Sequence, residues 1–165
     1  MDDTVAARLD RAAARLAALR PQVLAGAPWP LAEHFGTEPE AAWGPLEVLA
    51  HVAEMLGYWR GELERILDAP ADPVPFGRVA DDPLRIGLIA RDRTLPPAVL
   101  LDRIESGARA WRDRLSTLGE RDVARRGAHP TLGELGVAAF VERFVVGHLE
   151  DHAAQLERVL AGRSG

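Results

Sequence analysis

The sequence contains 165 residues, the length of one domain, and we expect residues 1–165 to fold as a single domain. Hydrophobic residues make up 47% of the chain and charged residues 27%, unlike the compositions of disordered, collagen-like and membrane-spanning chains. The formal net charge of −5 at pH 7 argues against binding to the phosphate backbone of a nucleic acid. We therefore expect neither a nucleic acid nor a membrane as partner.

Cysteine and lysine, two residue types that carry much enzyme chemistry, do not occur in the chain. Their absence excludes disulfides, thiolate nucleophiles, cysteine-ligated metals, Schiff-base catalysis and the lysine of a Walker loop. Any thiol chemistry would need an external thiol. There is no G-x-S-x-G motif for a serine nucleophile, and the acidic N-terminus shows no secretory signal, so we expect a cytoplasmic protein.

Apolar residues spaced three and four apart predict a first helix over residues 5–23 and a second over about residues 46–67. Pro28 follows the first helix, and Pro45 suits the first turn of the second. The apolar positions of these helices are Val5, Leu9, Ala12, Leu16, Leu19, Val23, Leu46, Leu49, Ala53, Leu56, Leu63 and Leu67.

Residues 69–95 are rich in proline and charge, which indicates a long crossover without strands. Within it, Asp82 before Pro83 could cap a short helix. A third long helix is predicted from about residue 96 to Gly119. Its apolar positions are Leu100, Ile104, Ala108, Trp111, Leu115 and Leu118.

The fourth helix is predicted to begin at Thr131, which forms a capping-box pattern with Glu134, and to end near Gly162. Its apolar face contains two imidazoles and an amide at positions where the spacing calls for apolar side chains. The residues along this face are Ala138, Val141, Val145, His148, His152, Gln155 and Val159. Together the four segments predict an all-α fold, an antiparallel four-helix bundle with a long crossover between helices 2 and 3 and little room for a sheet.

The two histidines on the fourth helix suggest a metal site. His148 and His152 are four residues apart, so both rings can reach one cation from the same helix face. A third ligand must come from another helix, and His51 lies at the edge of the apolar face of the second. Three neutral histidines with an open fourth position are typical of catalytic zinc. Each ring could instead be a hydrogen-bonded core histidine, and Leu149 after His148 rules out the H-E-x-x-H motif of metalloproteases.

Residues 43–52 (WGPLEVLAHV) and 147–156 (GHLEDHAAQL), with a weaker match at 129–133 (HPTLG), resemble the DinB/YfiT-like superfamily of metalloenzymes. The resemblance implies a four-helix bundle, often a homodimer, that binds zinc or nickel through His51, His148 and His152. Related branches are transferases or isomerases that use a low-molecular-weight thiol, mycothiol or bacillithiol, which would suit a chain without cysteine. Other members have no assigned reaction, and some keep the fold without an evident metal.

Four further residues are candidates for the surroundings of the metal or the substrate. Gln155 shares the face of the two histidines and could bind a ligand there, or could fix the register of the helices. Glu47 and Asp151 could orient a ligating imidazole or could be solvated charges. His129 could reach the mouth of the bundle, although a hydrogen bond across its own turn is the favoured interpretation.

The sequence thus supports two functional hypotheses. The first is a metal-dependent enzyme that acts on a small-molecule substrate by thiol transfer or by hydrolysis. The second is a non-catalytic helical module for dimerisation or binding, in which the three histidines form a structural or vestigial metal site.

Overall fold

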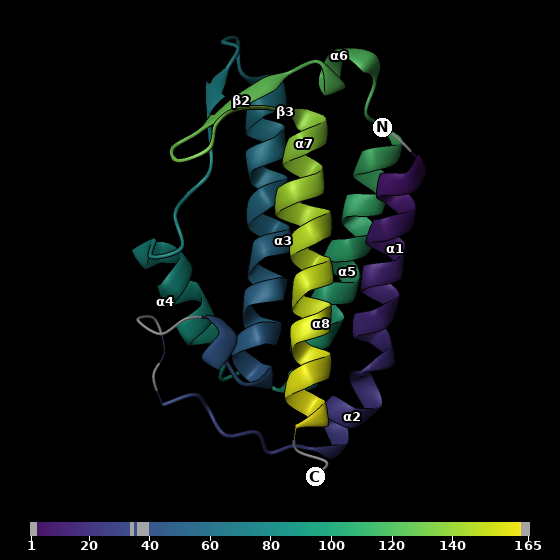
Figure 1. The fold of residues 1–165 in the computed structure, drawn as a ribbon, viewed down its shortest axis with the longest axis vertical. Helices are drawn as coiled ribbons and strands as arrows, with labels where there is room; N and C mark the ends of the chain where they lie inside the picture. Colours follow the sequence, from purple (N-terminus) through teal and green to yellow (C-terminus); the bar gives the residue numbers. More distant parts are fainter. Residues whose placement is uncertain (1–2, 34, 36–39, 163–165) are drawn as a thin grey trace.

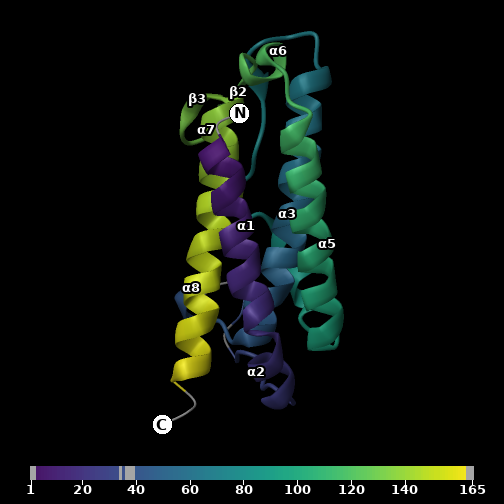
Figure 2. The ribbon, with the colours of Figure 1, turned by 90° about the vertical axis from the view of Figure 1, so that its right-hand side faces the viewer.

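The computed structural model describes residues 3–33, 35 and 40–162. Four long helices run side by side along the longest axis of the molecule: α1 (Asp3–Ala18), α3 (Pro45–Asp68), α5 (Pro97–Ser116) and α8 (His148–Ala161) (Figure 1). In the view of Figure 2, α1 lies between α8 and the α3–α5 pair. The predicted four-helix bundle is confirmed. None of the helices in the described part of the chain is long and apolar enough to span a membrane.

The predicted apolar faces meet in one core along the bundle axis. Trp111 of α5 is fully buried there, and its Nε1 donates a hydrogen bond of 2.8 Å to the carbonyl of Leu56 on α3. This bond satisfies the one polar atom of a large core side chain. The other buried residues of the predicted faces include Leu9, Leu16, Val23, Leu49, Leu63, Leu100, Ile104, Val141 and Val145.

The first predicted helix is broken into two parts, because α1 ends at Ala18 and α2 (Arg20–Ala25) follows after Leu19. Pro21 explains the break, since proline has no N–H to donate and its ring clashes with the carbonyl four residues earlier. Proline also bounds α3, which begins at Pro45 and ends at Asp68, where Ala69 is extended (ψ 143°) before Pro70.

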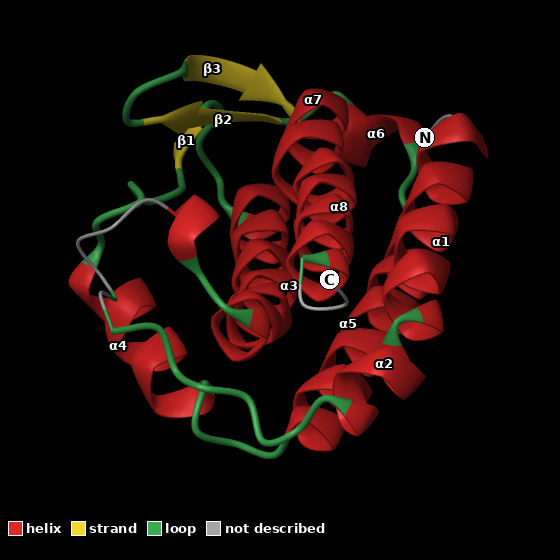
Figure 3. Ribbon diagram, turned by 60° about the horizontal axis from the view of Figure 1, so that its bottom comes forward, coloured by secondary structure: helices red, strands yellow, loops and turns green. Residues whose placement is uncertain are grey.

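The crossover between α3 and α5 contains β1 (Val74–Pro75) and α4 (Pro83–Asp92). Asp82 caps α4 as predicted, because its carboxylate accepts a hydrogen bond of 2.9 Å from the backbone N–H of Arg85. Figure 3 shows α4 on the side of α3 away from α1. The crossover therefore covers one flank of α3 instead of spanning the end of the bundle.

A small sheet was not expected from the sequence. After α6 (Glu120–Val123), β2 (Arg126–His129) pairs antiparallel with β3 (Gly133–Gly136) and parallel with β1, giving the order β1-β2-β3. The predicted helix start with a capping box at Thr131 and Glu134 was wrong, because these residues belong to the β2–β3 hairpin. Gly133 takes φ of +73°, which favours glycine and lets the chain reverse there. Strands of two to four residues are too short to show a reliable apolar alternation.

The last helical rod begins after this hairpin, at α7 (Val137–Val141). It continues through a π-helical segment, Glu142–Gly147, into α8 (Figure 1). A π-helical turn holds one more residue than an α-helical turn, and such turns occur frequently at functional sites. Here the π-helical segment directly precedes His148.

Candidate metal centre

Three histidines from two helices converge inside the bundle. His51 comes from the second turn of α3, and His148 and His152 occupy successive turns of α8. The Nε2 atoms of His51 and His148 are 3.1 Å apart, and the three ring centroids lie 4.7 to 5.0 Å from one another. His51 and His152 are almost completely buried. The structure thus brings together the three residues that the sequence singled out as metal ligands.

Gln155 fixes the protonation of the His152 ring. Its amide Nε2 donates a hydrogen bond of 2.5 Å to the backbone carbonyl of Glu40, so its Oε1 is the acceptor that faces His152 Nδ1 at 2.8 Å. Nδ1 must therefore carry the proton, and the lone pair of His152 lies on Nε2. That buried Nε2 atom has no hydrogen-bond partner among the described residues.

The π-helical segment provides a similar support for His148. In an α-helix the carbonyl of Phe144 would accept the backbone N–H of residue 148, but here that N–H is directed to the carbonyl of Val145. Burial lowers the pKa of His148 and the Phe144 backbone partly offsets this, so the Phe144 carbonyl lies near the His148 ring. Because Nε2 of His148 faces His51, Nδ1 is the ring nitrogen available to such an acceptor, as in metal sites where the second ring nitrogen donates to a carbonyl.

Burial keeps the three rings neutral. Burial lowers the pKa of His51 well below its ordinary value, and the neighbouring His152 and His148 lower it further. Burial, together with His152 and Arg85, lowers the pKa of His148 to about 3, and burial also lowers the pKa of His152. Neutral imidazole is the form that binds a metal ion. No protons need to be displaced from imidazolium groups at neutral pH.

A fourth ligand candidate, Glu40, lies in a short 3₁₀ helix (Glu40–Ala42) and was not predicted. Its Oε2 is 3.8 Å from His152 Nε2, while Arg85, which stands over the Trp43 ring, holds Oε1 through a short ion pair. No spacing rule connects residue 40 to three histidines on other helices. The sequence therefore contained no signal for it.

The donor set fits a divalent ion. One donor atom each from Glu40, His51, His148 and His152 lies within 4.8 Å of every other. The 3.1 Å between the Nε2 atoms of His51 and His148 is close to the ~3.3 Å that separates two nitrogen ligands of a tetrahedral zinc ion. A cation between these rings would also satisfy the unpartnered Nε2 of His152. Imidazole and carboxylate ligands suit zinc and nickel.

Two hollows adjoin this centre. An outer hollow of about 540 Å³ lies along α8, and an inner cavity of about 260 Å³ lies between α3, α4 and the sheet. Glu40 and His148 line both. The outer hollow is also lined by Asp151, His152, Gln155, Arg158 and Val159. The inner cavity is also lined by His51, Trp59, Arg78, Val79, Ala80, Arg85, His129, Thr131 and Phe144. A small molecule could therefore reach the imidazoles from either side.

The two carboxylates predicted near the histidines have different surroundings. Asp151 is exposed in the outer hollow and acts on His152 through its charge alone. Glu47 is completely buried, but its hydrogen bonds go to the backbone N–H groups of Ala32 (2.9 Å) and Gly44 (3.1 Å) and to Arg93 (2.9 Å). Glu47 therefore anchors the start of α3 and orients no imidazole.

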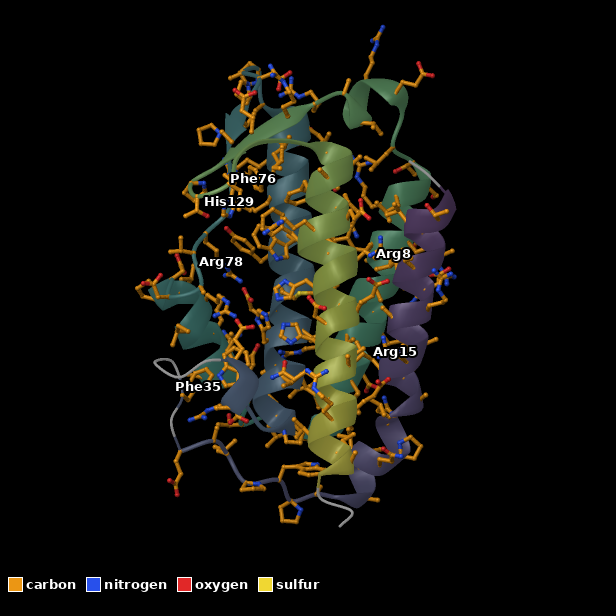
Figure 4. All side chains as sticks on the ribbon, viewed as in Figure 1. Arg8, Arg15, Phe35, Phe76, Arg78 and His129 are labelled. Atoms are coloured by element: carbon orange, nitrogen blue, oxygen red, sulfur yellow. The ribbon has the colours of Figure 1, made fainter. Side chains whose placement is uncertain are left out.

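His129 combines the two roles considered for it. Its Nδ1 accepts a hydrogen bond of 3.3 Å from the N–H of Thr131, as in the turn interpretation, and its ring stacks on Phe144 with centroids 5.1 Å apart. It also lines the inner cavity. Figure 4 shows it beside Phe76 and Arg78.

A buried ion pair next to His51 was not predicted either. Arg78 donates from Nη2 to Glu54 at 2.6 Å, and Glu54 Oε2 lies 4.0 Å from His51 Nδ1. The side chains of both members of the pair are less than a tenth exposed. Charged residues are almost never fully buried without a partner, and here Arg78 and Glu54 are partners of each other. The pair forms part of the wall of the site beside His51.

Comparison with known proteins agrees with this architecture. Residues 4–156 match the DinB superfamily, and the chain belongs to that superfamily. Its structure is similar to that of YfiT from Bacillus subtilis, with a TM-score of 0.73 and 19% sequence identity over 99% of this chain and 87% of that one. YfiT is described as a probable metal-dependent hydrolase with an unusual four-helix bundle topology. At this identity the likeness shows the fold. No curated protein matches the chain.

Proposed function

We propose that this protein is a metal-dependent enzyme that acts on a small molecule. His51, His148, His152 and Glu40 would hold one divalent ion, zinc or nickel. The observation that carries the proposal is the convergence of three neutral imidazoles with a buried ring nitrogen that has no hydrogen-bond partner among the described residues. A fold that needed these residues only for packing would gain stability from apolar side chains at the same positions.

The ion would supply Lewis acidity to a substrate oxygen or to a nucleophile. The chain itself offers no cysteine or lysine nucleophile, and the proposed reaction takes its nucleophile from solution. Water would give hydrolysis, the reaction class named for YfiT, and a thiol such as mycothiol or bacillithiol would give thiol transfer. Arg85 holds one oxygen of Glu40 and leaves Oε2 facing the imidazoles, where it can bind the ion or accept the proton of the nucleophile.

The second candidate is a dimerisation module with a structural or vestigial metal site. The observation in its favour is a hollow of about 330 Å³ between α1 and α5, away from the imidazoles. Small and apolar side chains line much of it, including Ala13, Ala17, Leu101 and Ile104. A second copy of the chain could cover this surface without involving the histidines.

Metal analysis of protein purified without a nickel column separates the two candidates. We expect about one zinc or nickel ion per chain, and we expect His148→Ala to lose it while keeping the helical circular dichroism spectrum. His129→Gln is the matched control and should keep the ion, because His129 is outside the ligand set. If removing the ion unfolds the chain, the site is structural. If no ion is bound and a chelator leaves Tm unchanged, the proposal is wrong.

The reaction class is tested on the metal-loaded protein. Ester and amide substrates test hydrolysis, and electrophilic substrates with mycothiol or bacillithiol test thiol transfer. Activity that disappears with His148→Ala and remains with Arg103→Gln, a change at a half-exposed arginine outside both hollows, would support an enzyme. A protein that binds stoichiometric metal but is inactive in both assays, with or without added thiol, would favour the dimerisation module.

A further inference from the structure

Arg78 carries hydrogen-bond donors that the fold does not use. Its side chain is 7% exposed, and its Nη2 donates to Glu54. Its Nε and Nη1 atoms are buried and have no hydrogen-bond partner among the described residues. Leaving a buried donor unsatisfied costs about 1–3 kcal/mol, and more for a charged group. Arg78 is one of the residues that line the inner cavity, so an acceptor bound there would lie beside its guanidinium group.

The backbone that carries Arg78 is held tightly in place. Gly77 takes φ of +87°, and a Cβ there would lie 2.4 Å from Cδ2 of His129, so the backbone passes directly against that ring. His129 is itself fixed by Thr131 and Phe144. The guanidinium of Arg78 lies over the Tyr58 ring at 3.7 Å. Arg78 is therefore held in position before any ligand arrives, which lowers the entropic cost of binding.

The charges around the cavity favour an anionic ligand once a divalent ion is bound. Glu54 pairs with Arg78 and Glu40 pairs with Arg85, so the four side chains cancel in formal charge. A divalent ion on the imidazoles would then make the site electropositive, and an anionic ligand would offset part of that charge. Arg85 already uses its two Nη atoms on Glu40 and the Ala80 carbonyl. Among the described residues that line the cavity, Arg78 is an arginine with buried donors that have no hydrogen-bond partner.

We propose that Arg78 binds a carboxylate of the substrate and so places the reactive group of that substrate at the three imidazoles. This inference rests on the proposed function, since it assigns a substrate class to the same site. A carboxylate accepts only, which suits a site whose free groups are donors. The cavity of about 260 Å³ is below the ~300–1,000 Å³ of pockets for drug-sized ligands, and Trp59 and Phe144 add aromatic walls. The expected substrate is thus a small carboxylic acid with an apolar portion.

Benzoate and benzamide are suitable probes because they share a shape and differ in charge. We expect benzoate to bind the metal-loaded protein in calorimetric titration and to shift the Nε–Hε signal of Arg78 in NMR spectra, and benzamide to bind roughly tenfold or more weakly. Arg78→Gln should weaken benzoate binding by a similar factor. Arg103→Gln, which removes a half-exposed arginine paired with Asp92, is the matched control and should leave benzoate affinity unchanged.

Glu54→Gln should change benzoate affinity in the direction opposite to Arg78→Gln. It releases Nη2 of Arg78 from its carboxylate, so benzoate should bind severalfold more tightly. Because Arg78→Gln leaves Glu54 buried without its partner and could unfold the chain, the double variant Arg78→Gln/Glu54→Gln removes both charges. The double variant should fold, as judged by circular dichroism, and should not bind benzoate.

Metal content measured on the same samples keeps the two proposals separate. Equal benzoate affinity in the wild type and the double variant, with the metal retained, would overturn the role of Arg78 and leave the proposed function standing. Benzoate binding that depends on Arg78 in a chain without metal would support the carboxylate site while the proposed function fails. Binding of inorganic phosphate but not of benzoate would overturn the assignment of a carboxylate.

Discussion

The polar side chains on the two long edges of α8 differ in whether they have hydrogen-bond partners within the chain. On the edge facing α1, Arg8 donates from Nε and Nη2 to Glu150 at 3.0 and 2.7 Å, and Arg15 makes the same paired contact with Glu157 (Figure 4). On the edge facing α3, His152 is buried, and its Nε2 atom has no partner in the described chain. The polar groups on the first edge bond to one another, whereas a buried ring nitrogen on the second edge has no partner among the described residues.

This difference separates structural from functional polar groups. Partly exposed ion pairs such as those of Arg8 and Arg15 contribute about 0–1 kcal/mol each and need no ligand. A buried ring nitrogen without a partner costs about 1–3 kcal/mol. Buried polar groups without a protein partner are found mainly where a ligand bonds to them and offsets this cost. A polar group that is buried but fully satisfied, such as Glu47, should therefore matter for stability and not for metal binding.

The largest predicted effect tests that distinction. Glu47→Ala should lower the free energy of unfolding by about 3 kcal/mol, because it removes the acceptor of two backbone N–H groups and the carboxylate that pairs with the half-buried Arg93. Urea denaturation at neutral pH measures the change. Glu64→Ala, which removes a carboxylate that is 37% exposed, should cost about 1 kcal/mol or less. Equal losses in both variants would show that Glu47 does not anchor α3.

Gln155→Ala should weaken metal binding by roughly 10- to 100-fold with little change in fold, because nothing then holds the His152 ring with its lone pair on Nε2. Competition with a chelator gives the affinity. Gln155→Glu should recover part of it, since a carboxylate still accepts from Nδ1 but cannot donate to the Glu40 carbonyl. Gln22→Ala, on the exposed face of α2, should have no effect. If Gln155→Ala binds metal like the wild type, Gln155 only fixes the helix register.

The smallest effect concerns the satisfied edge of α8. Arg8→Gln should lower the free energy of unfolding by less than about 1 kcal/mol at pH 7. The hydrogen bond from Arg8 lowers the pKa of Glu150, so this stabilisation is present above the unfolded carboxyl pKa of about 4.3 and is lost as the pH falls through the lower folded value. The gap between wild type and variant should close at low pH and shrink in high salt. A gap independent of pH would mean that packing of the Arg8 stem, and not its charge, stabilises the contact.

The sequence predicted those features that follow a helical period. The four apolar faces, the cap at Asp82 and the pairing of His148 with His152 all depend on spacing along one helix, which is visible without a structure. The break at Leu19 was missed because the apolar spacing continues through it, although Pro21 is a helix-breaking residue visible in the sequence. The small sheet was missed because its strands are two to four residues long.

The parts of the site that were not predicted depend on tertiary contacts. Glu40, Arg85 and Arg78 come from the loop before α3 and from the crossover, where no period relates them to the imidazoles. Glu47 was considered beside His51 because it lies one turn away, but its carboxylate points to the backbone at the start of α3. Which way a side chain on a helix edge turns depends on the neighbouring segments, and the sequence alone does not give their positions.

The central claim is that three imidazoles from α3 and α8 hold one metal ion. Anomalous diffraction from crystals of the zinc-loaded protein, recorded on both sides of the zinc absorption edge, tests it most directly. We predict one strong anomalous peak per chain, enclosed by the Nε2 atoms of His51, His148 and His152. A zinc peak elsewhere on the chain, or ring nitrogens bonded to protein acceptors with no peak between them, would contradict the account.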